Sequence, residues 1–267
     1  MPELPEVETI KRFLNSQIIG KKIKEITIFK SKSFIGDPKA IIGAKIIAIE
    51  RRAKILIIKL SNNKNLLVHL KMSGQLVLNE KLNNKYTRII ISFNDNSQLF
   101  FNDLRMFGWI KVIDNLNLKS QISKFGPEPF DKKFTTDYMK NIFSRTRRPI
   151  KLVLMDQEKI AGIGNIYANE ILFDSRINPL KRANQLPRED IKILRYSILR
   201  ILREAIKYNG SSATDEAYIQ PTGEKGSYQK HFSVYQREKE KCKRCGNKIE
   251  RINLGGRGTF YCSACQS

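Results

Sequence analysis

Four cysteines stand near the end of this 267-residue chain, and the chain contains no others. They form two Cys-x2-Cys pairs, Cys242 with Cys245 and Cys262 with Cys265. Each pair places two thiolates on one tight turn, and two such turns complete a tetrahedron around Zn²⁺. Four thiolates leave no coordination position for a substrate, so the spacing predicts one structural zinc ion and argues against a disulfide framework.

The residues between the two pairs follow a strand–turn–strand pattern. Apolar residues in 249–254 and 259–261 flank the turn Gly255–Gly258, which contains Arg257. This pattern predicts a hairpin held by zinc with a basic residue at its tip. Such a hairpin suits the groove of a nucleic acid, and an arginine in a solvated turn is an equally good explanation of Arg257 alone.

The formal net charge is +23. Residues 1–130 carry 22 Lys and Arg against 11 Asp and Glu, and residues 131–267 carry 27 against 15, which gives +11 and +12. A charge excess spread over the whole chain indicates a polyanionic partner, and it provides affinity for any nucleic acid. A composition bias toward Lys and Ile is the alternative, and charge alone leaves it open.

Composition also bears on the compartment. Hydrophobic residues make up 41% of the chain, which excludes a disordered protein. No apolar run approaches the ~18 residues of a membrane helix. The acidic start with two prolines does not resemble a secretory signal. We therefore expect a soluble, cytoplasmic protein. We also expect it to be monomeric and, through nucleic-acid binding, associated with the nucleoid.

The periodicity of apolar residues divides the chain into four segments and predicts an α+β multidomain protein. Residues 1–115 read as a helix from Glu6 to about Asn15 followed by a β-sandwich. Residues 131–209 have helical spacing, 210–230 form a glycine- and lysine-rich loop, and 231–267 contain the cysteines. The predicted strands are Lys22–Phe29, Lys45–Ile49, Ile55–Leu60, Leu66–Leu70, Arg88–Phe93, Gln98–Asn102 and Trp109–Ile113. The predicted helices begin near Tyr138, Pro149, Ile166 and Arg188.

Six short motifs lie in order along nearly the whole chain. They are Pro2–Thr9, Arg51–Lys54, His69–Gly74, Asn102–Gly108, Lys159–Tyr167 and Gly256–Cys262. Together they resemble the formamidopyrimidine-DNA glycosylase (Fpg/MutM) family. The resemblance implies an N-terminal helix plus β-sandwich, a helix–two-turn–helix domain and a zinc-finger β-hairpin. It also implies a bifunctional glycosylase and abasic-site lyase of base excision repair, which acts on double-stranded DNA containing oxidised purines or abasic sites.

The resemblance assigns catalysis to Pro2, Glu3, Lys54 and Arg257. Removal of Met1 exposes Pro2 as a secondary amine, which attacks C1′ and forms a Schiff base. An α-amine has a pKa near ~8, so about a tenth of it is free base at pH 7. Glu3 is the implied general acid and base. Lys54 contacts the lesion phosphate and assists β-elimination, and Arg257 grips phosphates and serves δ-elimination.

Glu6 follows one helical turn after the proposed nucleophile. It is in position to orient the proline or its water. A first-turn acid favoured by the helix dipole is the alternative.

The resemblance also implies a set of DNA contacts, because an enzyme that acts on a base must extrude it from the stack. Met72 and Phe107 match wedge residues, and Arg105 matches the residue that hydrogen-bonds the opposite cytosine. His69, Lys159 and Asn165 match phosphate contacts, and Tyr86 and Lys151 complete the predicted set. Met72 and Phe107 as core residues, and His69 as a structural histidine, are the alternatives. The loop Ser211–Gly226 corresponds to the lesion-capping loop of the family.

Three residues depart from the family pattern. Tyr86 stands where the family commonly has a histidine, and Leu104 and Met106 replace a proline and a basic residue beside Arg105. The departures concern backbone contacts near Tyr86 and the opposite-base preference, while the catalytic positions match.

Three other functions compete with this interpretation. An endonuclease VIII-like glycosylase for oxidised pyrimidines belongs to the same superfamily, but the Glu3-Leu4-Pro5 start and the long 211–226 loop favour purines. A non-catalytic zinc-ribbon module explains the charge and the cysteines but gives Pro2, Glu3 and Lys54 no purpose. An RNA-binding protein is disfavoured because the chain lacks the stacking motifs of RNA-recognition modules.

Overall fold

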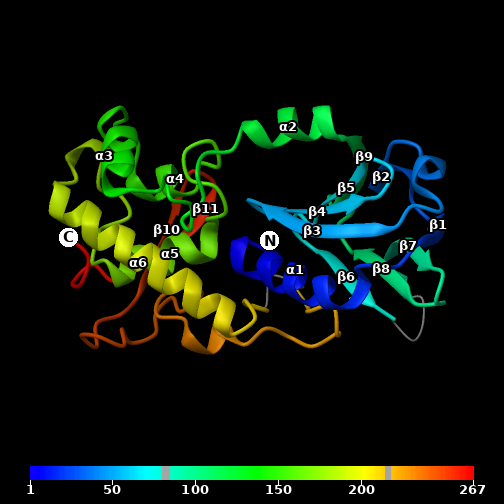
Figure 1. The fold of residues 1–267 in the computed structure, drawn as a ribbon. Coiled ribbons are helices and arrows are strands. Elements are labelled where there is room, and N and C mark those ends of the chain that lie inside the picture. Colours follow the sequence, from blue (N-terminus) through cyan, green and yellow to red (C-terminus); the bar gives the residue numbers. More distant parts are fainter. Residues whose placement is uncertain (80–84, 214–217) are drawn as a thin grey trace. The chain divides into compact units, whose positions relative to one another are not determined.

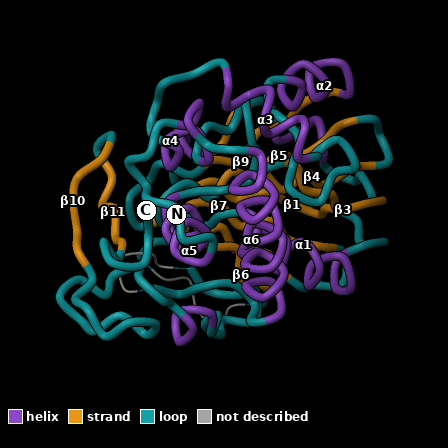
Figure 2. The backbone as a smooth tube through the Cα atoms, turned by 90° about the vertical axis from the view of Figure 1, so that its left-hand side faces the viewer, coloured by secondary structure: helices purple, strands orange, loops and turns teal. Residues whose placement is uncertain are grey.

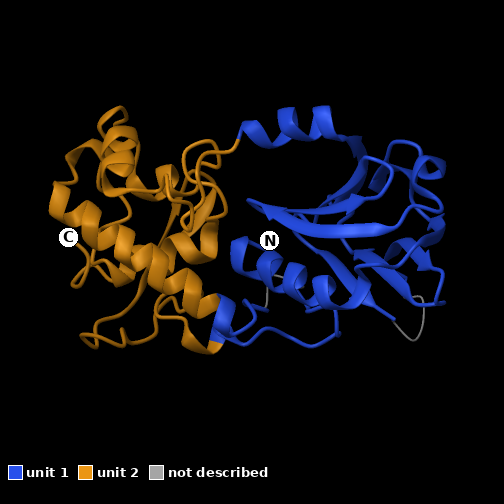
Figure 3. Cartoon of the chain, in the orientation of Figure 1, with its two compact units in different colours: residues 1–124, 206–229 blue, residues 125–205, 230–267 orange. Residues whose placement is uncertain are grey.

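The computed structural model describes residues 1–79, 85–213 and 218–267. It contains two compact units, shown in Figure 3. Unit 1 comprises Met1–Lys124 and Ile206–Gln229, and unit 2 comprises Phe125–Ala205 and Lys230–Ser267. No helix of the described residues is long and apolar enough to span a bilayer.

Among the residues that the structure describes, unit 1 contains two sheets and two α-helices (Figures 1 and 2). The sheets have the strand orders β1-β7-β8-β6 and β2-β9-β5-β4-β3, and the β2–β9 pair is parallel while the other pairs are antiparallel. The elements are α1 (Leu4–Ile18), β1 (Ile23–Ile28), η1 (Ser31–Ser33), β2 (Phe34–Ile35), η2 (Pro38–Ile41), β3 (Ile46–Arg52), β4 (Ile55–Leu60), β5 (Lys64–His69), β6 (Gly74–Leu78), β7 (Thr87–Phe93), β8 (Gln98–Asp103), β9 (Trp109–Asp114) and α2 (Asn115–Ser123). The 3-10 helix η4 (Tyr228–His231) begins at the end of this unit.

All seven predicted strands are confirmed, and two further strands and helix α2 were not predicted. β2 has two residues, and β6 starts at a glycine and lies at a sheet edge, so neither has the long β-branched run that identifies a strand. The first helix was predicted from Glu6 to about Asn15, but it extends from Leu4 to Ile18. Apolar residues three or four positions apart form its buried face, which packs into the main core of unit 1.

Residues 206–229 pack with unit 1, whereas the sequence predicted a separate segment over 210–230. The backbone N–H of Ser211 donates to Glu6 Oε1 at 2.8 Å, and that of Leu78 donates to the carbonyl of Pro221 at 2.9 Å. Tyr218 is buried in the same core as α1. Part of the predicted lesion-capping loop, 214–217, lies outside the described residues. These contacts attach both described ends of the loop to the unit that holds Pro2.

Unit 2 consists of helices and one two-stranded sheet, which Figure 2 shows as the ribbon β10–β11. The elements are α3 (Thr136–Ser144), α4 (Ile150–Leu154), α5 (Asn165–Asp174), η3 (Ala183–Gln185), α6 (Arg188–Lys207), β10 (Glu250–Leu254) and β11 (Arg257–Tyr261). Helix α6, which ends in unit 1, buries Ile191, Leu194, Ile198, Ile201, Leu202 and Ala205, the apolar side that the spacing predicts.

Candidate functional site

The start of the chain is buried and held by hydrogen bonds. Pro2 is buried, and Glu3 is only 1% exposed at the N-cap of α1. The backbone N–H of Glu3 donates to Glu6 Oε2 at 2.8 Å, while the other oxygen of Glu6 accepts from Ser211. The structure contains Met1, so the nitrogen of Pro2 is part of a peptide bond here. Glu6 therefore connects the predicted nucleophile segment to the base of the 211–226 loop.

Lys54 lies in the tight turn between β3 and β4 and is 5% exposed. Ala53 adopts the left-handed region with φ of 54°. Arg51 Nη1 donates to the carbonyl of Ala53 at 2.8 Å, and its Nε forms an ion pair with Glu8 on α1 at 3.0 Å. Arg51 thus fixes the turn that presents Lys54, which explains why both residues belong to one motif.

His69 is the last residue of β5 and is held as a neutral imidazole. Burial, followed by the charges of Lys71 and Lys54, lowers its pKa from 6.5 to about 3. Its Nδ1 accepts the backbone N–H of Lys71 at 3.0 Å, so the proton of the neutral ring is on Nε2. His69 is therefore equipped to donate a neutral hydrogen bond, and it does not supply positive charge.

The predicted DNA wedges lie on two neighbouring loops of unit 1. Met72 is half-buried, whereas Arg105 and Phe107 are exposed, Phe107 by 56%. The Arg105 guanidinium lies 5.3 Å from the centre of the Phe107 ring. An exposed phenylalanine is unlike a core strand residue, which argues against the alternative for Phe107. Tyr86 is half-buried, and its carbonyl accepts the N–H of Asp103.

In unit 2, Arg257 is exposed and begins strand β11 of the predicted hairpin. The two turn residues Gly255 and Gly256 have φ of 58° and 72°, which a two-residue hairpin turn requires. The next carbonyl, that of Gly258, accepts from Lys151 Nζ at 2.9 Å and from Asn165 Nδ2 at 3.2 Å. Side chains of α4 and α5 therefore hold the strand at the residue that follows Arg257.

Lys151 was predicted to contact DNA, and the structure gives it another role. Its side chain is fully buried, and Nζ also donates to Thr259 Oγ1 at 2.7 Å. The DNA contact of Lys151 stays a prediction, and in this structure its ammonium anchors the hairpin through these two hydrogen bonds. The sequence carries no sign of this, because lysines are seldom fully buried.

Lys159 and Asn165 flank a tightly bonded loop of unit 2. Lys159 is half-buried, and its carbonyl accepts from the Tyr138 hydroxyl at 2.7 Å. The side chain of Gln157 bridges the loop, donating to the carbonyl of Ile163 at 2.7 Å and accepting from the N–H of Gly162 at 2.9 Å. Asn165 is the first residue of α5, where the helix dipole favours anions. Both residues remain predicted phosphate contacts.

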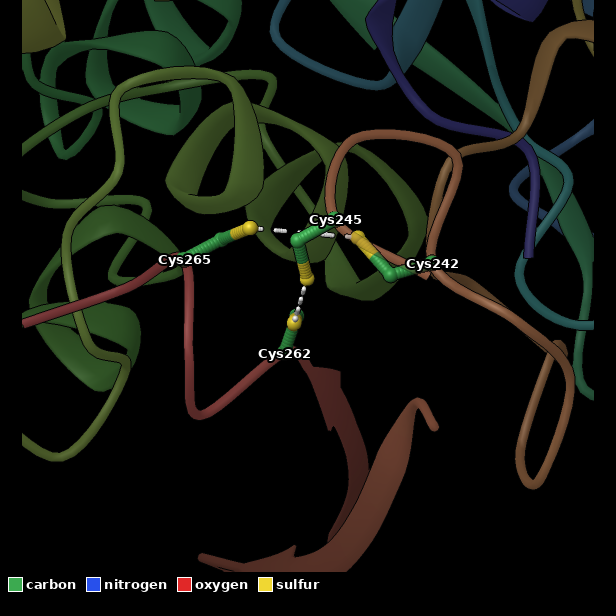
Figure 4. A group of neighbouring side chains, drawn as sticks. All are labelled: Cys242, Cys245, Cys262 and Cys265. Carbon is green, nitrogen blue, oxygen red and sulfur yellow. Dashed lines mark hydrogen bonds between the residues drawn. The ribbon is translucent and has the colours of Figure 1, made fainter. Parts of the chain in front are cut away.

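The four cysteine side chains converge from two turns, as Figure 4 shows. Their sulfurs all lie within 4.8 Å of one another, with 3.9 Å between Cys242 and Cys265 and 3.5 Å between Cys245 and Cys262. Sulfurs about 2.3 Å from a tetrahedral zinc lie about 3.8 Å apart, so the cluster fits the ion. Burial and the neighbouring thiols raise the pKa of Cys265 to about 12. At Cys242 burial is outweighed by the backbone N–H groups of Arg244 and Cys245, which lower its pKa to about 7.

Helix α5 carries further residues that hold the zinc segment and that were not predicted. The buried carboxylate of Glu170 accepts the backbone N–H groups of Ser233, Val234 and Tyr235 at 2.7, 3.0 and 2.8 Å. Asn169 Oδ1 accepts the N–H of Phe260 at 2.8 Å. The sequence did contain a sign of this role. Asn169 and Glu170 are polar residues within an otherwise apolar helix, and a buried polar group needs a hydrogen-bond partner.

Known proteins match the chain along its length. Family models describe a formamidopyrimidine-DNA glycosylase N-terminal domain over residues 1–110, its H2TH domain over 125–217, and a zinc finger found in FPG and IleRS over 239–267. A formamidopyrimidine-DNA glycosylase of Exiguobacterium sp. is 38% identical over 276 residues, covering 100% of this chain and 99% of that protein. The chain belongs to the formamidopyrimidine-DNA glycosylase family.

Solved structures of this family share the fold of the chain. One is a complex of the Lactococcus lactis FPG mutant G226P with Fapy-dG containing DNA, at 35% identity and a TM-score of 0.93. Another is Lactococcus lactis Fpg with abasic site containing DNA, at 34% identity and a TM-score of 0.92. Each match covers 99% of both chains. The predicted resemblance, the α+β multidomain fold class and the single structural zinc site are confirmed.

Proposed function

We propose that this chain is a DNA glycosylase and abasic-site lyase of base excision repair. It excises oxidised purines, 8-oxoguanine and formamidopyrimidines, from double-stranded DNA and then cleaves the strand by β,δ-elimination. Membership of the family supports this proposal, together with the lesion and abasic-site DNA bound by its relatives. We also propose a cytoplasmic location with nucleoid association, which a DNA substrate supports.

One observation carries the catalytic assignment: the first residues of the chain are buried. The first residues of most domains are poorly ordered unless tied down. Here Pro2 is buried, Glu3 is almost inaccessible, and Glu6 binds the backbone of Glu3. A terminus held this firmly places an amine and a carboxylate in a defined position, which nucleophilic and acid–base catalysis both need.

The proposed chemistry begins after removal of Met1. The amine of Pro2 attacks C1′ of the damaged nucleotide, the bond from C1′ to the base breaks, and Glu3 delivers a proton as the base leaves. The nitrogen then loses its proton, the C1′–O4′ bond of the sugar breaks, and O4′ takes up a proton, which leaves the amine and C1′ joined as an iminium cation. This cation accepts the electron pair released when a 2′ proton is removed. The 3′ phosphate leaves in this β-elimination, with Lys54 beside it. Arg257 grips phosphates and serves the second elimination.

Zinc has no place in these steps. Cys242, Cys245, Cys262 and Cys265 would hold it, and the ion fixes the base of the β10–β11 hairpin on which Arg257 is presented. Its four ligands are all protein sulfurs, so it binds no substrate.

Borohydride trapping tests the proposal. We expect the mature protein to form a covalent adduct with an 8-oxoguanine:C duplex. As the matched control, an N-terminal extension keeps the nitrogen of Pro2 in a peptide bond, and this variant should bind abasic-site DNA without being trapped. Pro2→Gly should also lose the adduct. If the mature wild-type protein leaves no adduct, the Schiff-base mechanism is wrong.

A second assay separates purine from pyrimidine lesions. Excision rates on 8-oxoguanine:C and thymine-glycol duplexes are compared under single-turnover conditions. We expect the purine lesion to be the better substrate, and a clear preference for thymine glycol would favour the endonuclease VIII-like alternative.

A further inference from the structure

Two motifs of unit 1 contain residues that the proposed chemistry leaves unused. The segment His69–Gly74 carries Met72 but also Ser73, and the segment Asn102–Gly108 carries Arg105 and Phe107 but also Asp103. The strand register of β6 and β8 pairs Gly74 with Asp103, so the two segments meet at one end of the sheet.

Asp103 lies where the two segments meet and forms hydrogen bonds with both of them. Its side chain is completely buried and accepts three hydrogen bonds. Oδ1 accepts the Ser73 hydroxyl at 2.5 Å and the N–H of Arg105 at 3.2 Å, and Oδ2 accepts the N–H of Gly108 at 2.7 Å. Ser73 Oγ accepts the same Arg105 N–H at 2.9 Å. One carboxylate thus joins both loops.

The backbone of Asp103 is fixed as well. Its N–H donates to the carbonyl of Tyr86 at 2.9 Å, and its carbonyl accepts from Arg88 Nε at 2.8 Å. The loops also approach one another too closely for larger residues. A Cβ at Gly74 would lie 2.5 Å from the Leu70 carbonyl oxygen, and one at Gly108 would lie 3.0 Å from Asp103 Oδ2. The carboxylate therefore occupies a rigid position.

The same loops hold two residues in a left-handed backbone conformation that residues other than glycine rarely adopt. Lys71, just before Met72, has φ of 53°, and Met106, just before Phe107, has φ of 55°. Such conformations persist only where the surrounding structure enforces them. Each precedes an apolar side chain that is predicted to enter DNA, so the direction of both side chains depends on the loops being held.

We propose that Asp103 is a positioning residue for lesion recognition. Its carboxylate, together with Ser73, sets Met72, Arg105 and Phe107 in one arrangement before DNA arrives. Asp103 contacts no substrate atom and acts through the loops. Because it binds the backbone N–H of Arg105 directly, it also determines how strictly Arg105 selects the opposite base. This inference rests on the proposed glycosylase function.

The Asp103 carboxylate and the Ser73 hydroxyl together are called the Asp103 clamp below. Two substitutions, one mild and one more severe, test its role. Asp103→Asn keeps the size of the side chain but replaces one acceptor oxygen by a donor, which faces either Gly108 N–H or the pair formed by Ser73 and Arg105. Ser73→Ala removes only the bridging hydroxyl and is the safer variant for folding. Thr87→Val is the matched control, because the Thr87 hydroxyl donates a buried hydrogen bond to the side chain of Asn102, the strand residue before Asp103, and not to the Asp103 carboxylate or to Ser73.

The experiment measures single-turnover excision of 8-oxoguanine opposite C and opposite A, and trapping on a single-stranded abasic oligonucleotide. We expect both clamp variants to excise the lesion about 10- to 100-fold more slowly, with the preference for C over A falling toward one. Trapping on the single strand, where no orphaned base needs a partner, should stay within about threefold of wild type. Thr87→Val should keep the base preference.

Several results would overturn the inference. They are an unchanged preference for C over A in Ser73→Ala, equal losses on duplex and single strand, or the same loss of preference in Thr87→Val. If Asp103→Asn does not fold, Ser73→Ala decides the question. Failure of the wild-type protein to be trapped would instead refute the glycosylase function, so the two failures are distinguishable.

Discussion

At the scale of single residues, burial and hydrogen-bond partners distinguish Lys151, which supports the fold, from Lys159, which is exposed enough to contact DNA. Lys151 and Lys159 both lie in unit 2, and the sequence predicted a DNA contact for each. The structure buries Lys151 against the carbonyl of Gly258 and the hydroxyl of Thr259, whereas Lys159 keeps part of its surface. We therefore expect Lys159, rather than Lys151, to neutralise a phosphate.

Lys151→Met should therefore loosen the hairpin without removing a phosphate contact. Loss of two hydrogen bonds from a charged donor should cost about 1–3 kcal/mol of stability. The ratio of δ- to β-elimination products should fall, because Arg257 is less firmly placed. Thermal unfolding and product analysis on abasic-site DNA measure these effects.

The matched comparison uses the salt dependence of DNA affinity. Lys159→Ala should make the slope of log K against log salt shallower by about one, and Lys151→Met should leave it unchanged. A shallower slope for Lys151→Met would mean that this ammonium reaches a phosphate after all.

His69 makes a prediction about pH. Its pKa is about 3 in the folded protein against 6.5 in the unfolded chain, because burial and two lysines disfavour the cation. Between these values the unfolded chain binds more protons, so stability falls as pH decreases. His69→Gln should reduce this loss between pH 6.5 and 3, as measured by urea denaturation across that range. If wild type and variant lose stability in parallel, the histidine is not held neutral.

At the scale of elements, the β10–β11 hairpin is held at both ends. Zinc closes the base through the four cysteines, and Lys151, Asn165 and Asn169 bind strand β11 along its length. Two strands alone are marginally stable in water, so the hairpin depends on these attachments.

Removal of zinc should release the hairpin. Cys262→Ser, or a chelator, should make residues 240–267 sensitive to protease and weaken DNA binding by about tenfold or more, since zinc binding and local folding are coupled. Ser263→Ala, an exposed non-ligand between two of the cysteines, is the control and should behave as wild type. Full protease resistance after verified zinc loss would show that the side-chain anchors suffice.

At the scale of the whole molecule, net charge sets the strength of non-specific binding. The excess of +23 is divided almost equally between the two halves of the sequence. Three charged phosphate contacts are proposed, Lys54, Lys159 and Arg257, since His69 is neutral. Other lysines can only add to this number.

Affinity for undamaged duplex DNA should fall with salt accordingly. Three phosphate contacts give a slope of about −2.7 for the logarithm of the binding constant against the logarithm of the salt concentration. This slope corresponds to about a 40-fold loss of affinity between 50 and 200 mM salt. Fluorescence anisotropy over that range measures it. A slope shallower than this value would mean that fewer of the three residues reach the backbone than proposed.

Local pattern accounts for much of the fold. Alternation of β-branched residues locates seven strands, helical spacing locates α6 and its buried side, and cysteine spacing identifies the zinc site. Short or glycine-bearing elements such as β2 and β6 escape prediction because they are defined by their partners in the sheet.

The sequence by itself determined the family, the fold class, the zinc ligands and the list of residues that carry the proposed chemistry, because these depend on residue type and spacing. Only the tertiary structure decided that the ammonium of Lys151 is an anchor, that His69 is neutral, and that Asp103 joins two loops. Each of these depends on which groups lose water and which distant atoms they meet, and burial and long-range contact are not encoded by spacing along the chain.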